Sequence, residues 1–487
     1  MSIESITDAS KSDHYVLVPF MAQGHMIPML DIAQLLANRG ARVSFITTPV
    51  NATRIKPLLD DRKSNNEFIN VVELTFPCKE FGLPEGCENI DLITSVDHYK
   101  PFFHAAISLV EPFKLYIREA TPTVTCIISD YSSFFTAEVG QSLNIPRIIF
   151  HGPSCLYIHG THSIRIHNSF DGVAEFDSIA VPDLPKKIEM NKLQAWGWFS
   201  DPGWEDFRAK AAEAEASSFG VVMNTCYELE SEIIDRYERL IKKRVWPIGP
   251  LCLYGNHIGL KGDRGKKSSV DEAQLLNWLD SKEAKSVLYV SFGSLVQTKT
   301  SQLIEIGLGL ENSKVPFIWV IKEIERTVEF EKWISTERFE ERTKGRGIVI
   351  TGWAPQVVIL SHGSVGGFVT HCGWNSVLEA VSAGVPMLTW PHFVDQFFNE
   401  KLIVEVIETG VAVGVNKPYH YLLEDEVAVK SEVMSKAVLQ LMDKGEEGEE
   451  RRRRAKQYGD KGRKAMDEGG SSWMNLSLFM DFMSRSV

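Results

Sequence analysis

Strand-like runs alternate with helical stretches along this chain, and the alternation occurs in two separate series. Residues 14–47 contain a β-rich run, then apolar residues at helical spacing over 29–40 ending at Gly40, then a second β-rich run. A strand, a helix and a strand in so short a segment form a βαβ unit, which requires parallel strands. Further strands of the first half are expected at 123–129, 145–152 and 220–225.

The second series restarts after a short polar segment. Its expected strands are 286–294, 316–321, 347–353, 366–371 and 386–390, with a helix near 301–312. Residues 257–269 between the two series are rich in Gly, Lys and Ser and have little to bury, which is typical of a linker. The sequence therefore predicts an α/β protein divided into 1–250, a linker at 251–270, a second unit at 271–460 and a C-terminal helix at 461–487 that packs back on the first unit.

Composition excludes several classes of function. The net charge of −12 argues against a nucleic-acid or anionic-membrane surface, and no apolar run reaches the roughly 18 residues of a membrane span. The first residues lack the layout of a signal peptide. Seven cysteines without CxxC spacing fit reduced, buried thiols, so we expect a cytoplasmic protein.

A polar cluster precedes a helical run in THCGWNSVLEAVSAGVP, residues 370–386. Ser376 and Glu379 have the S-x-x-E spacing of a capping box, which is the simpler interpretation. Capping, however, does not require His371, Trp374 or Asn375. Because a helix start offers free N–H groups and the positive end of the helix dipole, these extra donors favour a diphosphate site that would need no metal ion.

The 44 residues from Trp353 to Gln396 resemble the signature box of the plant family-1 UDP-glycosyltransferases nearly position for position. Three further segments are similar to segments of the family: PFMAQGHMIPMLDIAQLLANRG, FHGPS and YVSFGS. The residues of MAQGHMIPMLDIA and FHG are most similar to the branch that acts on flavonoids, steroids and triterpenoid saponins. The resemblance implies a GT-B fold: two facing Rossmann-like domains with a cleft between them. The N-terminal domain would bind the acceptor and the C-terminal domain the UDP-sugar.

The resemblance also assigns donor-binding roles within the box. Trp353 would stack its indole on the uracil, and the main chain of Ala354 would bind the base edge. Gln356 and Glu379 would bond the ribose hydroxyls, since a carboxylate suits a vicinal diol.

The remaining donor contacts are assigned in the same way. The residues expected to hold the diphosphate are Ser294, His371, Asn375 and Ser376. The residues expected to meet the sugar are Trp374, Asp395 and Gln396. In the family a glutamine at the end of the box goes with glucose, and an arginine in place of Trp374 goes with glucuronate. The donor substrate is therefore expected to be UDP-glucose, with no metal and no further cofactor.

Two residues of the first half form a candidate catalytic pair. His25 and Asp130 both follow strands of the predicted parallel sheet, so both can open onto the sheet edge where α/β proteins bind ligands. A carboxylate hydrogen-bonded to one imidazole nitrogen leaves the other nitrogen as a general base. The resemblance assigns these roles to His25 and Asp130, with a single inverting displacement that forms a β-glucoside.

The acceptor pocket is less clearly marked. Three aromatic-rich segments, at 99–107, 150–157 and 193–204, could line an apolar pocket, with core packing the favoured role for each. No pocket residue is therefore assigned from the sequence.

Other functions lack their motifs. The turn after the first strand has AQGHMIP in place of the G-x-G-x-x-G of NAD-dependent oxidoreductases, and neither G-x-S-x-G nor HExxH occurs. A catalytically silent UDP-sugar-binding protein would not need both His25 and Asp130. The acceptor, extension of an existing sugar, and attack by carbon instead of oxygen stay open; monomer is the family default.

Overall fold

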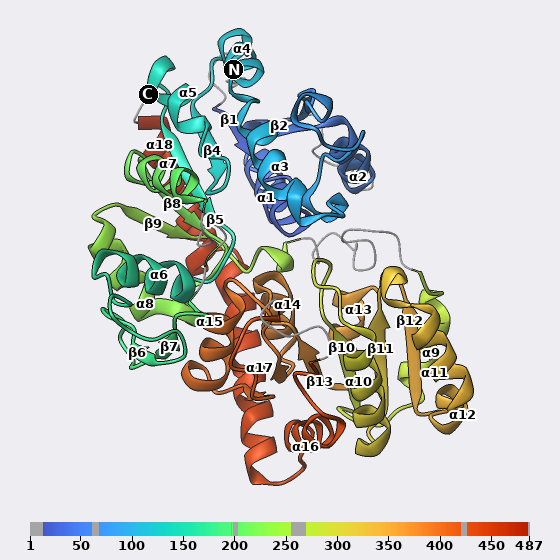
Figure 1. Ribbon diagram of the computed structural model, residues 1–487. Helices are drawn as coiled ribbons and strands as arrows, with labels where there is room; N and C mark the ends of the chain where they lie inside the picture. The colour runs from blue at the N-terminus through green and yellow to red at the C-terminus, as the bar shows by residue number, and fades with distance from the viewer. Residues whose placement is uncertain are drawn as a thin grey trace, which may run out of the picture.

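The computed structural model describes residues 13–60, 68–195, 197, 203–254, 269–419 and 426–485. Its chain forms two lobes, the first half of the sequence in one and most of the second half in the other (Figure 1). The predicted linker at 251–270 falls mostly on residues 255–268, which lie outside the described residues.

Within the described part of the first lobe, a seven-stranded parallel sheet has the order β3-β2-β1-β4-β5-β8-β9. Its strands are β1 His14–Val18, β2 Arg42–Thr47, β3 Ile69–Glu73, β4 Cys126–Asp130, β5 Arg147–His151, β8 Gly220–Met223 and β9 Arg244–Pro247. A small antiparallel ribbon lies apart from it, made of β6 Ser178–Ala180 and β7 Glu189–Asn191.

In the second lobe, the described residues form a six-stranded parallel sheet in the order β12-β11-β10-β13-β14-β15. Its strands are β10 Val287–Ser291, β11 Phe317–Ile321, β12 Gly347–Thr351, β13 Val365–Thr370, β14 Met387–Thr389 and β15 Gly410–Ala412. Every strand expected from the sequence is present. In each sheet the order reverses beside the first strand, β1 or β10, and α/β proteins bind ligands at the carboxyl ends of strands at such a point.

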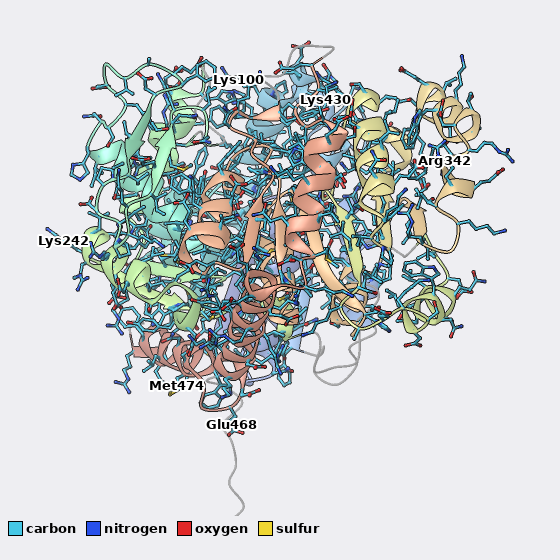
Figure 2. All side chains as sticks on the ribbon, turned by 90° about the horizontal axis from the view of Figure 1, so that it is seen from below. Lys100, Lys242, Arg342, Lys430, Glu468 and Met474 are labelled. Carbon is cyan, nitrogen blue, oxygen red and sulfur yellow. The ribbon has the colours of Figure 1, made fainter. Side chains whose placement is uncertain are left out.

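Helices cover the faces of both sheets, which explains why the central strands β1, β4 and β10 are buried along their whole length. Those of the first lobe are α1 Gln23–Ala37, α2 Pro49–Asp60, α3 Tyr99–Ile107, α4 Val110–Glu119, α5 Thr136–Leu143, α6 Cys155–Ile166, α7 Glu205–Ala216 and α8 Tyr227–Ile241. Those that follow are α9 Glu272–Asp280, α10 Thr300–Ser313, α11 Val328–Thr336, α12 Phe339–Arg342, α13 Gln356–Ser361, α14 Trp374–Ala383, α15 Gln396–Lys401, α16 Ser431–Leu441, α17 Glu446–Met466 and α18 Ser471–Arg485. Charged side chains such as Lys242, Arg342 and Glu468 lie at the rim of the molecule (Figure 2).

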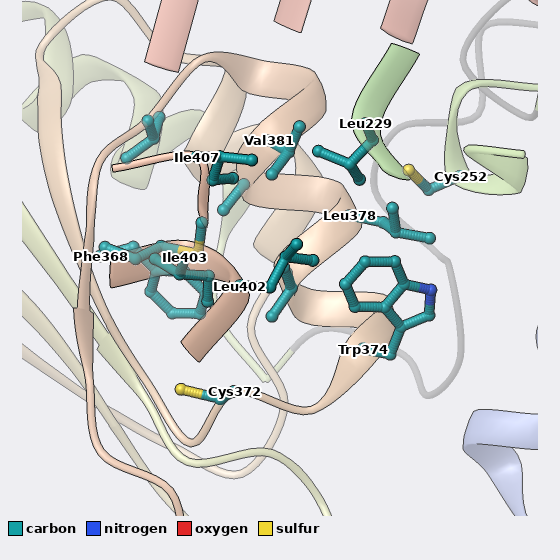
Figure 3. Packing of buried hydrophobic residues seen from close by; sticks show 14 of the residues in the cluster. Leu229, Cys252, Phe368, Cys372, Trp374, Leu378, Val381, Leu402, Ile403 and Ile407 are labelled. Carbon is teal, nitrogen blue, oxygen red and sulfur yellow. The ribbon is translucent and has the colours of Figure 1, made fainter. Parts of the chain in front are cut away.

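One buried hydrophobic cluster joins the two lobes. It contains Leu229 of α8 and Cys252, from the first half of the chain, together with Trp374 and Leu378 of α14 (Figure 3). All seven cysteines are free and buried, as predicted. The lobes therefore share a core, and the positions of their sheet edges are fixed relative to each other.

The C-terminal helices return to the first lobe. Helix α17 packs against α14 and α8, and α18 packs on β9, where Phe479 contacts the rings of Tyr15 and Trp246. Residues 461–466 continue α17 and 471–485 form α18. The domain boundaries at 1–250, 251–270, 271–460 and 461–487 remain predictions.

Helix α1 begins earlier than the sequence suggested. The apolar pattern placed its start near Met29, but the helix runs from Gln23, with Ala22 in an extended conformation before it. His25 therefore lies in the first helical turn and not in a loop before the helix. The pattern missed this because Gly24 and Pro28 disfavour a helix in isolation, whereas burial of this helix against the sheet overrides that preference.

Candidate functional site

A cavity of about 1090 Å³ lies between the lobes, where the carboxyl ends of both sheets meet. Its wall includes residues that follow β1, β4 and β5 in the first lobe and β10, β11 and β13 in the second. Every residue predicted for the site lines it: His25, Asp130, Ser294, Trp353, Ala354, Gln356, His371, Trp374, Asn375, Ser376, Glu379, Asp395 and Gln396. The structure thus brings the two halves of the predicted site together.

His25 and Asp130 form a hydrogen-bonded pair. The His25 Nδ1 lies 2.7 Å from the Asp130 Oδ2, and the Asp130 side chain is only 3% exposed whereas that of His25 is 25% exposed. The other carboxylate oxygen accepts a hydrogen bond from the Ser132 N–H at 2.8 Å. Phe20 packs edge-on against the imidazole. The ring is thus held through Nδ1, which leaves Nε2 for a ligand.

The charge of this histidine depends on two opposing effects. Burial lowers the pKa of His25, but the charge and hydrogen bond of Asp130, with a smaller contribution from Asp395, raise it above its ordinary value of 6.5. Such a histidine can accept a proton near neutral pH and hold it as a cation stabilised by Asp130.

The polar cluster at 371–376 does not form the capping box that the spacing suggested. Gly373 is the N-cap of α14 and Ser376 lies inside its first turn, so that interpretation is wrong. The Gln356 amide instead donates to the Ser376 hydroxyl at 3.0 Å and to the Glu379 carboxylate at 2.7 Å. These three side chains form one network at the cavity wall, because Glu379 faces α13 across the helix start.

His371 lies against two glycines just before this helix. A Cβ atom on Gly293 or Gly373 would come within about 2.5 Å of the ring, so only glycine fits there. The backbone then turns through Cys372 with φ at 66°, an uncommon conformation for a residue with a side chain. Burial, with the nearby charge of Lys322, lowers the pKa of His371 to about 3. The neutral ring can donate one N–H to an anion, and its Nδ1 has no hydrogen-bond partner among the described residues.

Trp353 lies on the cavity wall, in the segment between β12 and α13. Its backbone is fixed on Ser269 by two hydrogen bonds, from the Trp353 N–H to the Ser269 hydroxyl and from the Ser269 N–H to the Trp353 carbonyl. Gly352 before it has φ at 99°, which turns the chain away from β12. Ala354 follows at the wall, with its carbonyl accepting from the Gln356 N–H. This anchoring keeps the Trp353 ring and the Gln356 network on one side of the cavity.

Asn375 and Trp374 connect the two lobes. The Trp374 indole N–H donates to the Asn224 carbonyl at 2.7 Å, so this N–H is committed to a protein partner. The Asn375 side-chain amide donates to the Gly24 carbonyl at 2.7 Å. That carbonyl lacks its usual helical donor, because Pro28 four residues later has no N–H. A predicted diphosphate residue thus contacts the turn that carries His25.

Asp395 and Gln396 stand at the start of α15, after Val394 with φ at 55°. The Gln396 side-chain carbonyl accepts from the His392 and Phe393 N–H groups, which turns its NH₂ away from them. Asp395 accepts from Asn399 at 2.7 Å. Burial raises the pKa of Asp395 to about 6, against the lowering effects of the Asn399 hydrogen bond and His25.

Sequence reasoning missed several lining residues. Lys322, directly after β11, is the cation of the second lobe's described cavity wall. In the first lobe the wall also contains His151, Arg165 and Glu215. The segment 150–157, flagged for its aromatic residues, does line the cavity, whereas Phe102 and Phe103 of 99–107 are core. No local pattern marks Lys322 or Arg165, since single basic residues are common on any surface.

Within the described residues, no three His, Cys, Asp or Glu side chains are grouped so that they could hold a metal ion. Among the described helices, none combines the length and the apolar character needed to cross a membrane.

Known proteins resemble this chain over nearly its full length. A family model described as UDP-glucoronosyl and UDP-glucosyl transferase matches residues 205–432, and one described as glycosyltransferase, N-terminal domain, matches 14–253. UDP-glycosyltransferase 73C25 of Barbarea vulgaris is 45% identical and UDP-glycosyltransferase 73C5 of Arabidopsis thaliana 44% identical, each over 98% of both chains. The crystal structure of Glycyrrhiza uralensis UGT73P12, complexed with glycyrrhetinic acid 3-O-monoglucuronide, has a TM-score of 0.88 at 34% identity, covering 98% of this chain and 96% of that one.

Proposed function

Since the chain belongs to the UDP-glycosyltransferase family and has its GT-B fold, we propose that it transfers glucose from UDP-glucose to a hydroxyl of a small apolar plant metabolite. The enzyme class is that of its relatives; the donor, the inverting mechanism and the residue roles are the proposal. The observation that carries it is that the His25–Asp130 pair and the donor residues line a single cavity.

In the proposed reaction, the acceptor hydroxyl lies at the free Nε2 of His25. The imidazole takes the hydroxyl proton while the oxygen attacks the anomeric carbon from the face opposite UDP. The bond from that carbon to the UDP oxygen breaks, and UDP leaves with its electron pair. One displacement converts the α-linked donor into a β-glucoside, and Asp130 stabilises the imidazolium that results.

The leaving diphosphate would lie at the start of α14. This helix of ten residues presents its backbone N–H groups and dipole there, with His371, Ser376 and Ser294 as neutral donors. Lys322, whose Nζ lies 3.4 Å from the Glu325 carboxylate, is close enough to His371 for its charge to lower the pKa of that ring, and it adds a positive charge at the same end. Together these groups would stabilise the charge that develops on UDP as the bond breaks.

Two observations support glucose as the transferred sugar. Gln396 presents its NH₂ group with the carbonyl end fixed, and Asp395 stands beside it, so the pair offers a donor and an acceptor to sugar hydroxyls. Position 374 is tryptophan and not the arginine that goes with glucuronate. Because the indole N–H is bonded to Asn224, Trp374 would contact the sugar through its backbone.

The acceptor class follows from the relatives and the cavity. UGT73P12 is complexed with a triterpenoid glucuronide, and apolar side chains such as Ile27, Tyr157 and Ile158 line the cavity's first-lobe side. We expect a flavonoid, steroid or triterpenoid acceptor. Seven buried free cysteines favour a cytoplasmic protein, and a monomer is expected because it is the family default.

The direct test is mass spectrometry of the purified protein with UDP-glucose and a pooled panel of flavonoids, sterols and sapogenins. A product heavier by one hexose supports the proposal, and nuclear magnetic resonance of its anomeric proton should give the coupling of a β-glucoside. Parallel reactions with UDP-galactose and UDP-glucuronate should be much slower. A faster reaction with either of these donors would refute UDP-glucose as the donor substrate. An α-linked product would refute the inverting mechanism.

The pH profile should report the His25–Asp130 pair. The neutral imidazole is the active form, so kcat/KM should fall as pH drops through the raised pKa of His25. Asp130→Asn removes the charge that raises it, so the acidic limb should move to lower pH. The plateau should also fall, because the tautomer is no longer fixed. The measurement is kcat/KM from about pH 5 to 9, and an acidic limb that does not move would contradict the pairing.

Lys322 should contribute to diphosphate binding. Lys322→Met should weaken UDP binding by about tenfold, since a charge-assisted contact is lost. Uridine, which has the base and ribose but no phosphate, should bind nearly unchanged. Titration calorimetry with both ligands measures this, with Lys299→Met as control because Lys299 lies nearby on the Tyr419 ring and outside the cavity wall. Equal losses for UDP and uridine would assign Lys322 a structural role only.

A further inference from the structure

A second histidine–carboxylate pair lies in the cavity, on the strand next to that of Asp130. His151 ends β5, which pairs with β4 so that Asp130 is opposite Phe150. The His151 Nε2 lies 3.2 Å from the Glu215 Oε1, and the histidine is 2% exposed. Its Nδ1 is buried and has no hydrogen-bond partner among the residues the structure describes. The proposed reaction does not use this pair.

Arg165 stands beside the pair at the cavity wall. Its Nη2 lies 3.5 Å from the Glu215 Oε2 and 3.1 Å from the His162 Nδ1, and its side chain is 39% exposed. An ion pair at 3.5 Å is loose, so the guanidinium keeps donor capacity for a ligand. Tyr131, half-buried and adjacent to Asp130 in sequence, packs its ring near that of His151.

Positive charge is in excess around Glu215. Although burial raises the pKa of Glu215, the hydrogen bond and charge of His151 and the charge of Arg165 lower it to about 2, so the carboxylate is ionised. The buried Arg147 and the partly exposed Lys243 lie behind it, close enough for their pKa values to respond to its charge. The Glu215 carboxylate thus faces three cations, Arg165, Arg147 and Lys243. Two more basic residues, Arg208 and Lys192, also line the cavity.

The nearby acids do not cancel this excess. Asp130 is paired with His25, and Asp91 is paired with Arg54 at 2.8 Å. Glu205 lies near Arg208 but is exposed to solvent outside the cavity wall. An apolar acceptor would gain nothing from these cations and would bury Arg165 at a cost in solvation.

We propose that Arg165, with Tyr131 and His151 beside it, binds a carboxylate on the acceptor, so that the enzyme favours acidic acceptors over their neutral counterparts. The planar guanidinium matches a carboxylate in a bidentate arrangement. The ionised Glu215 accepts the hydrogen bond from the Nε2–H of His151, so the unpartnered Nδ1 donates to the anion only when the ring is protonated. The proposal rests on the proposed function, since it names the class of acceptor that the same cavity takes.

The test uses a matched pair of acceptors, oleanolic acid and its methyl ester, which share a free hydroxyl and differ in the charge of the carboxyl group. The acid and the ester are each tested as a substrate. Each is also tested as a competitive inhibitor of glucose transfer to the hydroxyl acceptor that the panel experiment identifies. The wild-type enzyme should favour the acid by about tenfold or more in kcat/KM or in inhibition constant. Arg165→Met should remove most of that preference and leave the ester within about threefold, and Arg165→Lys should keep part of it.

Controls separate charge recognition from folding and from the chemistry. Arg244→Met removes an exposed arginine outside the cavity wall and should leave the acid-to-ester ratio unchanged. Equal use of acid and ester by the wild type, or equal slowing of both by Arg165→Met, overturns the proposal. A product that alkali hydrolyses also overturns the proposal. Such a product is a glucose ester, so the acceptor carboxylate would be the group that attacks at His25 and not the group bound by Arg165. Absence of hexose transfer to every hydroxyl acceptor, with UDP still bound, instead refutes the proposed function on which it rests.

Discussion

Replacing His25 by alanine should reduce kcat by about a thousandfold, within the 10² to 10⁴ range of a lost general base. The histidine is the group held by Asp130 at 2.7 Å with its other nitrogen facing the cavity. UDP binding should be nearly unchanged, because the donor residues belong to the other lobe. Steady-state kinetics with saturating UDP-glucose and calorimetric titration with UDP provide the two measurements.

A second histidine–aspartate pair offers a matched control. His167 lies 2.9 Å from Asp183 on the surface, half exposed and outside the cavity wall. His167→Ala removes the same chemical group from the same kind of pair and should leave turnover unchanged. If His25→Ala retains more than about a tenth of wild-type turnover, His25 is not the general base.

Replacing Trp374 by alanine should destabilise the protein by about 3–5 kcal/mol, the usual cost of truncating a buried tryptophan. The indole is 4% exposed, packs in the core shared by the lobes, and donates to the Asn224 carbonyl (Figure 3). Trp374→Phe should cost less, since most of the packing survives while the carbonyl loses its donor. The melting temperature should fall by roughly 10 °C for the alanine variant.

The control is Trp473→Ala on α18. This tryptophan is 38% exposed and its ring meets Arg39 at the surface, so its truncation should lower the melting temperature by only a few degrees, roughly. Equal effects of the two substitutions would show that the Trp374 contact adds nothing to the joining of the lobes.

The fold and most of the site could be predicted because their signals are local. Strands buried on both faces are continuous apolar runs, and the segment from Trp353 to Gln396 carries its donors in one stretch. His25 and Asp130 were found by their places after two strands. Their 2.7 Å contact depends on β1 and β4 being neighbours, which parallel strands at the switch point provide.

The errors arose where a distant residue decides the local structure. Ser376 and Glu379 have the spacing of a capping box, but both side chains instead accept hydrogen bonds from Gln356 of another helix. The apolar pattern placed the start of α1 too late, because burial against the sheet outweighs the preferences of Gly24 and Pro28. Arg165 and Glu215 lie 50 residues apart on different helices, so no pattern in the sequence joins them.

Pro28 makes the first turn of α1 responsive to the opposite lobe. Without a proline N–H, the Gly24 carbonyl depends on Asn375 for its hydrogen bond, although Asn375 also stands where the diphosphate is expected. If a phosphate oxygen attracts the Asn375 amide, the carbonyl next to His25 loses or shares its donor. Occupancy of the donor site and the position of the general base would then be linked through a single carboxamide. The hydrogen bond that the proline removes from the helix would thus let the enzyme sense its donor before the acceptor reacts.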